Sequence, residues 1–248
     1  MTKQAFLDQF FIEYDKIATL GAPGYTAAEL SIIASEAQEA LVIEKYGPNS
    51  NRLKEGFEES EKRTQELGEL MVYASLTPTG PGFLDNSYTY TLPNTLLTTL
   101  PKGTDFSNVF WFTVFEEVLT NVIDCTIPGN TTKVVTAYVV EVTHDQYNLA
   151  VDNPFRKPYV KGNTGRVFRL RTSGFTHELV TDGTFGLQNY KIGYIKKPLP
   201  IDLTQNLTDQ VSQLADSFHR ELLHRTVEIA KADVQDPSLQ VNLNTLKE

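Results

Sequence analysis

The spacing of hydrophobic residues predicts three helices in the first 76 residues. A first stripe at helical intervals consists of Leu7, Phe10, Phe11, Tyr14, Ile17 and Ala18. A second runs from Leu30 to Leu41 and begins after Thr26-Ala-Ala-Glu29, which has the spacing of a capping box. A third begins near Ser50 and consists of Leu53, Phe57, Leu67, Leu70, Met71 and Ala74. Because the intervening loops are short, we expect the helices to be near neighbours.

The next 120 residues are rich in Val, Thr, Tyr and Phe and predict an antiparallel sheet. The expected strands are 108–120, 133–143, 166–172, 177–181 and 188–196. The segment 108–115 is apolar on both faces, which predicts a buried strand. In the segment 166–172, Phe168 and Leu170 alternate with Arg169 and Arg171, which predicts one apolar and one basic face. No helical pattern separates these strands, as βαβ units would require.

The chain returns to a helical pattern after Pro200. Two adjacent apolar stripes, from Leu207 to Ile229 and from Leu223 to Val234, predict a helix buried on more than one side. Beyond Pro237, Leu239, Val241 and Leu243 alternate with polar residues, as in an extended arm with one apolar face. The fold class is therefore α+β, a helical bundle of three N-terminal helices and one C-terminal helix with an inserted antiparallel β domain. The expected parts are 1–76, 77–204, 205–236 and the arm 237–248.

Composition and charge exclude several classes of protein. The 248 residues are 40% hydrophobic, and no apolar run is long enough to span a bilayer. Charged residues also interrupt the N-terminus where a signal peptide would be apolar. The net charge of −9 is uneven, at −6 over residues 1–75, +1 over 76–200 and −4 over 201–248. A general attraction to nucleic acid or to anionic lipid is therefore not expected.

Catalytic and metal-binding patterns are not evident in the sequence. It has no P-loop, no dinucleotide-binding glycine pattern and no nucleophile elbow. His219 and His224 are five residues apart, which does not suit a helical metal pair, and we interpret the four histidines as surface or interface residues. His144-Asp145 is interpreted as a turn or helix start. The single Cys125 excludes an intrachain disulfide and is interpreted as an inert thiol. We expect no catalytic residue, no metal ligand and no cofactor.

One cluster of residues remains as a candidate site. Between Asn153 and His177 the chain has six basic residues and no acidic one. The six are Arg156, Lys157, Lys161, Arg166, Arg169 and Arg171. Aromatic residues are interleaved with them, which suits a surface for an acidic protein or for phosphate. Three interpretations stay open: an acidic protein partner, nucleic acid, or a chance imbalance on the polar face of a sheet.

Several segments, taken in order, resemble the neck-ring structural proteins of crAss-like phages. These are Thr143-His-Asp-Gln-Tyr, Asp152-Asn-Pro-Phe-Arg-Lys-Pro158, Arg166-Val-Phe-Arg-Leu, the segment 190–201 and the helix Phe218 to Ala230. That last helix is also similar to the closing helix of podovirus head–tail adaptors. The resemblance covers most of residues 135–235, covers residues 50–75 more loosely, and does not extend to the C-terminal arm.

The resemblance implies a virion protein without catalytic activity. Such proteins form rings, commonly twelve-fold, that stack beneath the portal and extend the channel through which DNA leaves the capsid. The implied partners are further copies of the chain, the portal protein, adjacent ring or tail proteins, and double-stranded DNA that passes without specific binding. No membrane is involved, and the implied location is the virion neck or tail, with assembly in the host cytoplasm. From the residues themselves, we expect the interface of the ring to comprise the six basic residues together with Leu239, Val241 and Leu243.

Two other functions fit the composition. The aromatic-rich β segment could belong to a carbohydrate-binding or hydrolytic tail module, which would need exposed aromatic residues on one face of the sheet. A cytoplasmic bacterial scaffold of the same shape is the third possibility. We take the ring subunit as the leading hypothesis.

Overall fold

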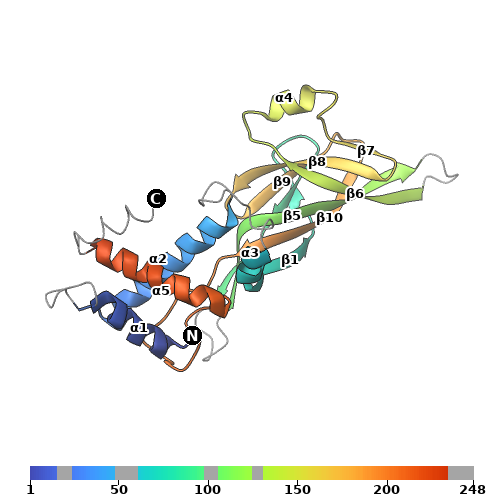
Figure 1. Cartoon of the computed structure of the whole chain (residues 1–248). Helices are drawn as coiled ribbons and strands as arrows, with labels where there is room; N and C mark the ends of the chain where they lie inside the picture. The colour runs from blue at the N-terminus through green and yellow to red at the C-terminus, as the bar shows by residue number, and fades with distance from the viewer. Residues whose placement is uncertain (16–23, 48–60, 98–105, 125–130, 234–248) are drawn as a thin grey trace. The chain divides into compact units, whose positions relative to one another are not determined.

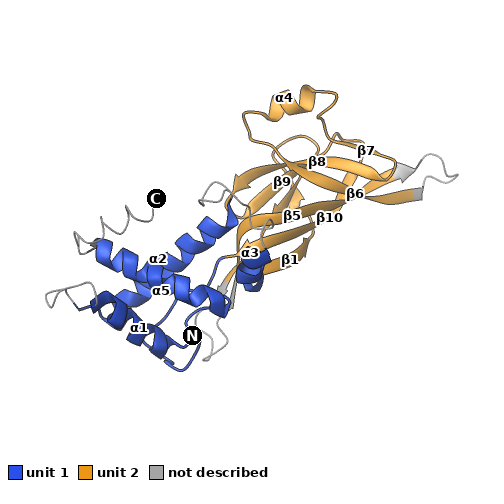
Figure 2. Ribbon diagram, in the orientation of Figure 1, with its two compact units in different colours: residues 1–70, 197–248 blue, residues 71–196 orange. Residues whose placement is uncertain are grey.

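The computed structural model describes residues 1–15, 24–47, 61–97, 106–124 and 131–233 (Figure 1). These residues form two compact units (Figure 2). Unit 1 comprises residues 1–70 and 197–248, and unit 2 comprises residues 71–196. The chain therefore enters and leaves unit 2 once.

Unit 1 is built from helices. They are α1 (Lys3–Asp15), α2 (Ala27–Tyr46), α3 (Glu61–Leu67), a 3₁₀ turn (Gly68–Leu70) and α5 (Asp216–Asp233). The capping box at the start of α2 is confirmed, since the Thr26 hydroxyl accepts from the Glu29 amide while the Glu29 carboxylate accepts from the Thr26 amide. Helix α5 packs on both α1 and α2. It buries Phe218, Leu222, Leu223, Val227 and Ala230, so its predicted two-sided burial is confirmed.

Polar side chains of α2 hold the segment that returns from unit 2. Ser31 and Ser35 accept hydrogen bonds from the backbone amides of Leu203 and Ile201, each at 2.9 Å. The Gln38 amide donates to the Leu199 carbonyl at 2.9 Å. These bonds satisfy the backbone of a segment without regular structure, which would otherwise bury unpaired amides.

Unit 2 is one large sheet with a short helix. Its strands follow the order β1-β10-β5-β6-β8-β9-β3-β2, with β4 paired to β5 and β7 paired to β8. Their bounds are β1 Met71–Leu76, β2 Gly80–Pro81, β3 Ser87–Thr91, β4 Asn94–Leu97, β5 Phe106–Asp124, β6 Thr131–Glu141, β7 Tyr159–Lys161, β8 Thr164–Ser173, β9 Thr176–Val180 and β10 Gly186–Lys196. Helix α4 (Tyr147–Asp152) lies between β6 and β7 in the chain.

The sheet curls so that side chains on the inner faces of distant strands contact each other. Strands β3 and β10 are well separated in the sheet order, yet the rings of Tyr90 and Tyr190 are 5.3 Å apart and the Tyr90 hydroxyl donates to the Gln188 carbonyl. The enclosed core includes Val118, Ala137, Val167, Ile192 and Tyr194. A second, smaller core beneath α4 holds Val142, Ala150, Phe168, Leu170 and Val180. Strand β8 therefore contributes to two cores, one on each of its faces.

Several expectations need correction. Residues 71–76 form strand β1 instead of the end of a helix, because they pair antiparallel with β10, a partner more than a hundred residues away. Strands β6 and β8 pair in parallel, since α4 and β7 supply the crossover that parallel pairing requires. The segment 108–115 is a strand but is buried only in part, and Phe115 is 46% exposed.

Unit 1 contains the helices of the predicted bundle. Within unit 1, α1, α2 and α5 pack together, whereas α3 spans only seven residues. The α+β class is confirmed, and a full four-helix bundle stays a prediction. The arm 237–248 lies outside the described residues, as does Cys125. None of the described helices combines the length and the apolar character needed to cross a bilayer.

Candidate functional site

The six basic residues of the predicted interface do not share one environment. Arg156, Lys157, Lys161 and Arg171 are exposed, and Arg166 is half-buried. Arg169 is buried, with its side chain 6% exposed and engaged by carboxylates of its own chain. We therefore correct its assignment from an interface to the interior of unit 2. Leu239, Val241 and Leu243 lie outside the described residues.

Arg166 links the exposed members of this group to the sheet. Its guanidinium donates to the Phe155 carbonyl at 2.6 Å and lies 5.1 Å from the ring centroid of Tyr159. The first contact fixes the loop that presents Arg156 and Lys157, and the second is a cation–π contact on strand β7. These basic residues are thus anchored to the strands that follow α4.

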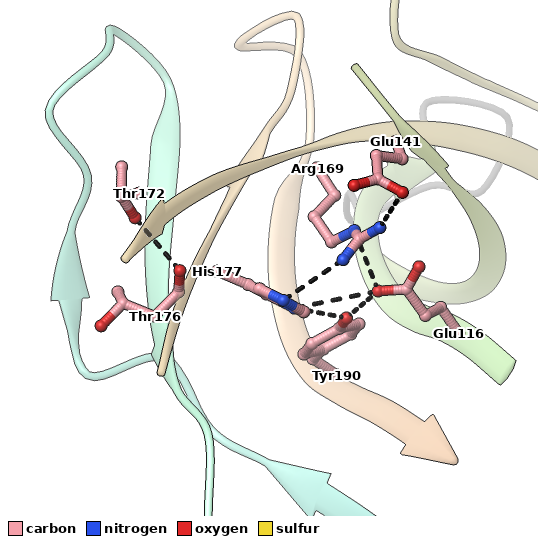
Figure 3. Close-up of polar contacts among 7 residues, drawn as sticks. All are labelled: Glu116, Glu141, Arg169, Thr172, Thr176, His177 and Tyr190. Carbon is pink, nitrogen blue, oxygen red and sulfur yellow. Dashed lines mark hydrogen bonds and ion pairs between the residues drawn. The ribbon is translucent and has the colours of Figure 1, made fainter. Parts of the chain in front are cut away.

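Arg169 belongs to a polar cluster enclosed by the curled sheet (Figure 3). The other members are Glu116 on β5, Glu141 on β6, His177 on β9 and Tyr190 on β10. The Arg169 Nη2 atom lies 2.6 Å from Glu141, and its Nε atom lies 3.2 Å from Glu116 without hydrogen-bond geometry. Five strands that are scattered along the chain thus meet at one arginine.

The cluster forms a directed chain of hydrogen bonds. Arg169 Nη1 is 3.2 Å from His177 Nε2, so Nε2 must be the acceptor, because an arginine can only donate. The proton of His177 is therefore on Nδ1, which lies 3.0 Å from the Tyr190 hydroxyl. That hydroxyl donates in turn to the Glu116 carboxylate. These hydrogen bonds satisfy both ring nitrogens of His177 and the Tyr190 hydroxyl.

Burial sets the protonation states of the cluster. Burial raises the pKa of Glu116, and the opposing attraction of Arg169 does not cancel this effect. Burial, with a smaller repulsion from Arg169 and Arg171, lowers the pKa of His177 to about 3. Burial also raises the pKa of Tyr190, and the negative charge of Glu116 raises it further. At neutral pH the histidine and the tyrosine are neutral, and Arg169 faces the two carboxylates.

His177 is expected to stay neutral in the folded protein down to about pH 4. A histidine with a folded pKa near 3 and an unfolded value near 6.5 contributes stability above pH 6.5, which is lost as the pH falls toward 3. Titration of the four histidines by NMR should therefore show no shift of the His177 ring signals between pH 7 and pH 4.5. A midpoint above pH 5 for the His177 ring in this titration would contradict the assigned network.

The geometry of this cluster fits a structural role, because its contacts join five strands of the sheet. The described part of the chain has no group of three or more His, Cys, Asp or Glu that could hold a metal. His177 and His219 are buried, so the expectation of surface or interface histidines is wrong for these two. His219 instead lies 3.1 Å from Asp216 and 2.9 Å from the N-terminal amine. The turn expected at His144-Asp145 is confirmed, and α4 begins soon after it.

The sequence offered partial signals for this cluster. Glu116 interrupts an apolar strand, and Arg169 lies between Phe168 and Leu170, so each is a polar residue in a segment with buried neighbours. His177 and Tyr190 gave no such signal, because only the pairing of β9 and β10 with their neighbours brings them to the other three.

Comparisons with known proteins agree on one family. A family described as phage tail ring protein 3/4 matches residues 1–240. The chain is 27% identical over 247 residues to Ring protein 4/5 of Bacteroides phage crAss001, covering 95% of this chain and 94% of that protein. It is also 26% identical over 241 residues to Ring protein 3 of the same phage, covering 93% and 95%. Because the family match extends over nearly the whole length, the chain belongs to the tail ring protein family of crAss-like phages.

Proposed function

We propose that the chain is a subunit of an oligomeric ring in the neck between portal and tail, where it extends the DNA channel. The observation that carries this proposal is the family match over residues 1–240. The chain is similar over its whole length, and to almost the same degree, to two differently numbered ring proteins of one phage. Such a relationship suits a tail in which related subunits form successive rings.

The proposed partners follow from this location. Further copies of the chain form the ring, which we propose to be twelve-fold, and the portal protein and adjacent ring or tail proteins contact its two ends. The subunit is synthesised in the host cytoplasm and is then built into the virion. We propose no catalytic role for it, and the contacts of the Arg169 cluster join strands of the sheet to one another.

The distribution of charge supports a channel wall that does not bind DNA. Unit 1 has 12 Lys and Arg against 21 Asp and Glu, which accounts for the whole net charge of −9, whereas unit 2 has 10 of each. Twelve copies would place a formal charge of −108 around the channel. An acidic wall repels DNA phosphates, and a basic wall would hold them by releasing counterions. We propose that unit 1 lines the channel.

Electron cryomicroscopy of the assembled tail tests this proposal. We expect a closed ring of this chain in which Asp and Glu outnumber Lys and Arg among the channel-facing residues. We also expect the exposed residues Arg156, Lys157, Lys161 and Arg171 to contact protein. A ring with those basic residues along the bore would contradict the proposed wall, and a tail that contains no ring of this chain would contradict the function.

A further inference from the structure

The outer face of the curled sheet presents a row of aromatic side chains. Tyr73 on β1 and Phe115 on β5 both pair with Gly193 on β10. Two residues beyond Phe115, Glu117 pairs with Tyr138 on β6. Residues that are paired, or two apart in one strand, share a face of a sheet. These three aromatic residues therefore lie on one face, opposite the enclosed core.

The row continues across the parallel part of the sheet. Tyr138 pairs with Arg166 on β8, which pairs in turn with Tyr159 on β7. The Tyr138 and Tyr159 hydroxyls are close enough to hydrogen-bond, and together with burial this contact raises the pKa of Tyr138. We call Tyr73, Phe115, Tyr138 and Tyr159 the aromatic band.

The band is accessible and is supported from beneath. Tyr73 is 69% exposed, Phe115 46% and Tyr138 47%. A Cβ at Gly193 would lie only 3.0 Å from the Tyr73 ring and 3.3 Å from Phe115 Cβ, so the glycine lets these two side chains pack over β10. Val134 lies four residues before Tyr138 on β6, so it is on the same face, where it is 52% exposed. Exposed aromatic and aliphatic side chains that gather on one face of a sheet are typical of a protein interface.

Basic residues border one end of the band. Arg166 lies over Tyr159 and holds the loop of Phe155, next to which Arg156 and Lys157 are exposed. Lys161, two residues after Tyr159 on β7, lies on the same face. We call Arg156, Lys157 and Lys161 the basic flank. Tyrosine and arginine are among the residues that contribute most to binding at protein interfaces.

Helix α2 presents a surface with complementary character. Ile32 is 64% exposed and Ile43 is 43% exposed, and Glu36 lies between them on the same helix face. At 1.5 Å per residue, the two isoleucines are about 16 Å apart. Tyr73 and Tyr138 are separated by three strand intervals, about 14 Å at the usual strand spacing. An apolar and acidic helix face thus matches the aromatic band in length and the basic flank in charge.

We propose that the aromatic band and basic flank of one copy bind the exposed Ile32–Ile43 face of α2 on the next copy. This inference rests on the proposed ring, because a ring needs a head-to-tail interface formed by two different surfaces of the same chain. The aromatic band provides the apolar centre, the basic flank faces Glu36 at its edge, and the acidic charge of unit 1 guides the approach.

Photo-crosslinking in assembled tails tests the contact directly. The probe is p-benzoylphenylalanine in place of Tyr138, in a preparation that mixes isotopically heavy and light copies of the full chain. We expect linked peptides of mixed isotope content that contain residues from α2. The same probe in place of Phe83, which is 93% exposed elsewhere on unit 2, is the matched control and should give no α2 product. Rings that form without a mixed-isotope α2 product would overturn this inference and leave the ring function intact.

Matched substitutions measure the strength of the contact. We expect Phe115→Ser to weaken assembly at least tenfold and Phe83→Ser to change it less than twofold. Arg156→Glu with Lys157→Glu should impair assembly in a salt-dependent way, and adding Glu36→Lys should restore part of it.

Normal rings from the Phe115→Ser chain would overturn the inference. Normal rings that lose binding to host glycans would instead support a carbohydrate-binding face. Failure of the unmodified chain to form rings even in tails would contradict the proposed function itself.

Discussion

Replacing Arg169 by methionine is expected to lower the free energy of unfolding of unit 2 by about 3–5 kcal/mol, because removing one partner of a buried ion pair leaves the other charge uncompensated. Glu116 is the residue left in this state, since its side chain is 11% exposed whereas that of Glu141 is 63% exposed. The substitution also takes away the donor that fixes the His177 tautomer. Chemical denaturation, followed through the near-UV signal of the tyrosines in unit 2, measures the effect.

A residue in the same strand supplies the control. Arg171 is exposed, so Arg171→Met should change the free energy of unfolding by less than about 0.5 kcal/mol. Adding Glu116→Gln to Arg169→Met should recover part of the loss, since the amide removes the buried charge and still accepts from Tyr190. Equal losses for Arg169→Met and Arg171→Met would show that the cluster does not stabilise the sheet.

Arg169 and Arg171 show which features of strand β8 could be predicted from the sequence. Their alternation with Phe168 and Leu170 correctly predicted a strand with two different faces. The further step, that the arginine face meets solvent, holds for Arg171 and is wrong for Arg169. The alternation reports which side a residue faces, and only the curl of the sheet decides whether that side is enclosed.

The elements predicted well were those whose pattern is local. Helices α1, α2 and α5 and the longer strands each have a stripe or an alternation within their own residues. Strand β1 has none, because Met71, Val72 and Ala74 suit a helix equally well and are fixed as a strand only by β10. The exposure of Phe115 could not be predicted from the sequence either. An apolar residue in an apolar strand gives no sign that its face of the sheet is not covered by other residues of the same chain.

The candidate sites depend on non-local pairing to different degrees. The residues of the basic flank lie close together in the sequence, so the flank could be found by counting charges. The aromatic band combines residues from positions 73 to 159, and its members share a face only through the register of six strands. Local pattern therefore predicted the charged edge of the proposed interface, and the sheet topology was needed to find its apolar centre.

Unit 1 is expected to depend in the same way on one residue of α5. Phe218→Ala should lower its free energy of unfolding by about 3–5 kcal/mol, because the ring is fully buried and its removal leaves a cavity. The ring also lies 5.4 Å from the amine of Lys45, which pairs with Glu66 at 2.8 Å and Glu221 at 2.7 Å. Burial alone would lower the pKa of Lys45, and the hydrogen bonds and charges of these two glutamates raise it instead.

This arrangement joins three helices at one place, since Lys45 lies in the last turn of α2, Glu66 lies in α3 and Glu221 lies in α5. Loss of the Phe218 ring opens a space beside the ion pairs, and water that enters it would weaken them further. Far-UV circular dichroism during thermal and chemical denaturation measures the loss, with exposed Arg220→Ala on the same helix as the control. A loss below about 1 kcal/mol would mean that the neighbouring side chains close the cavity. In that case Phe218 would not be the residue that holds the C-terminal helix to the N-terminal ones.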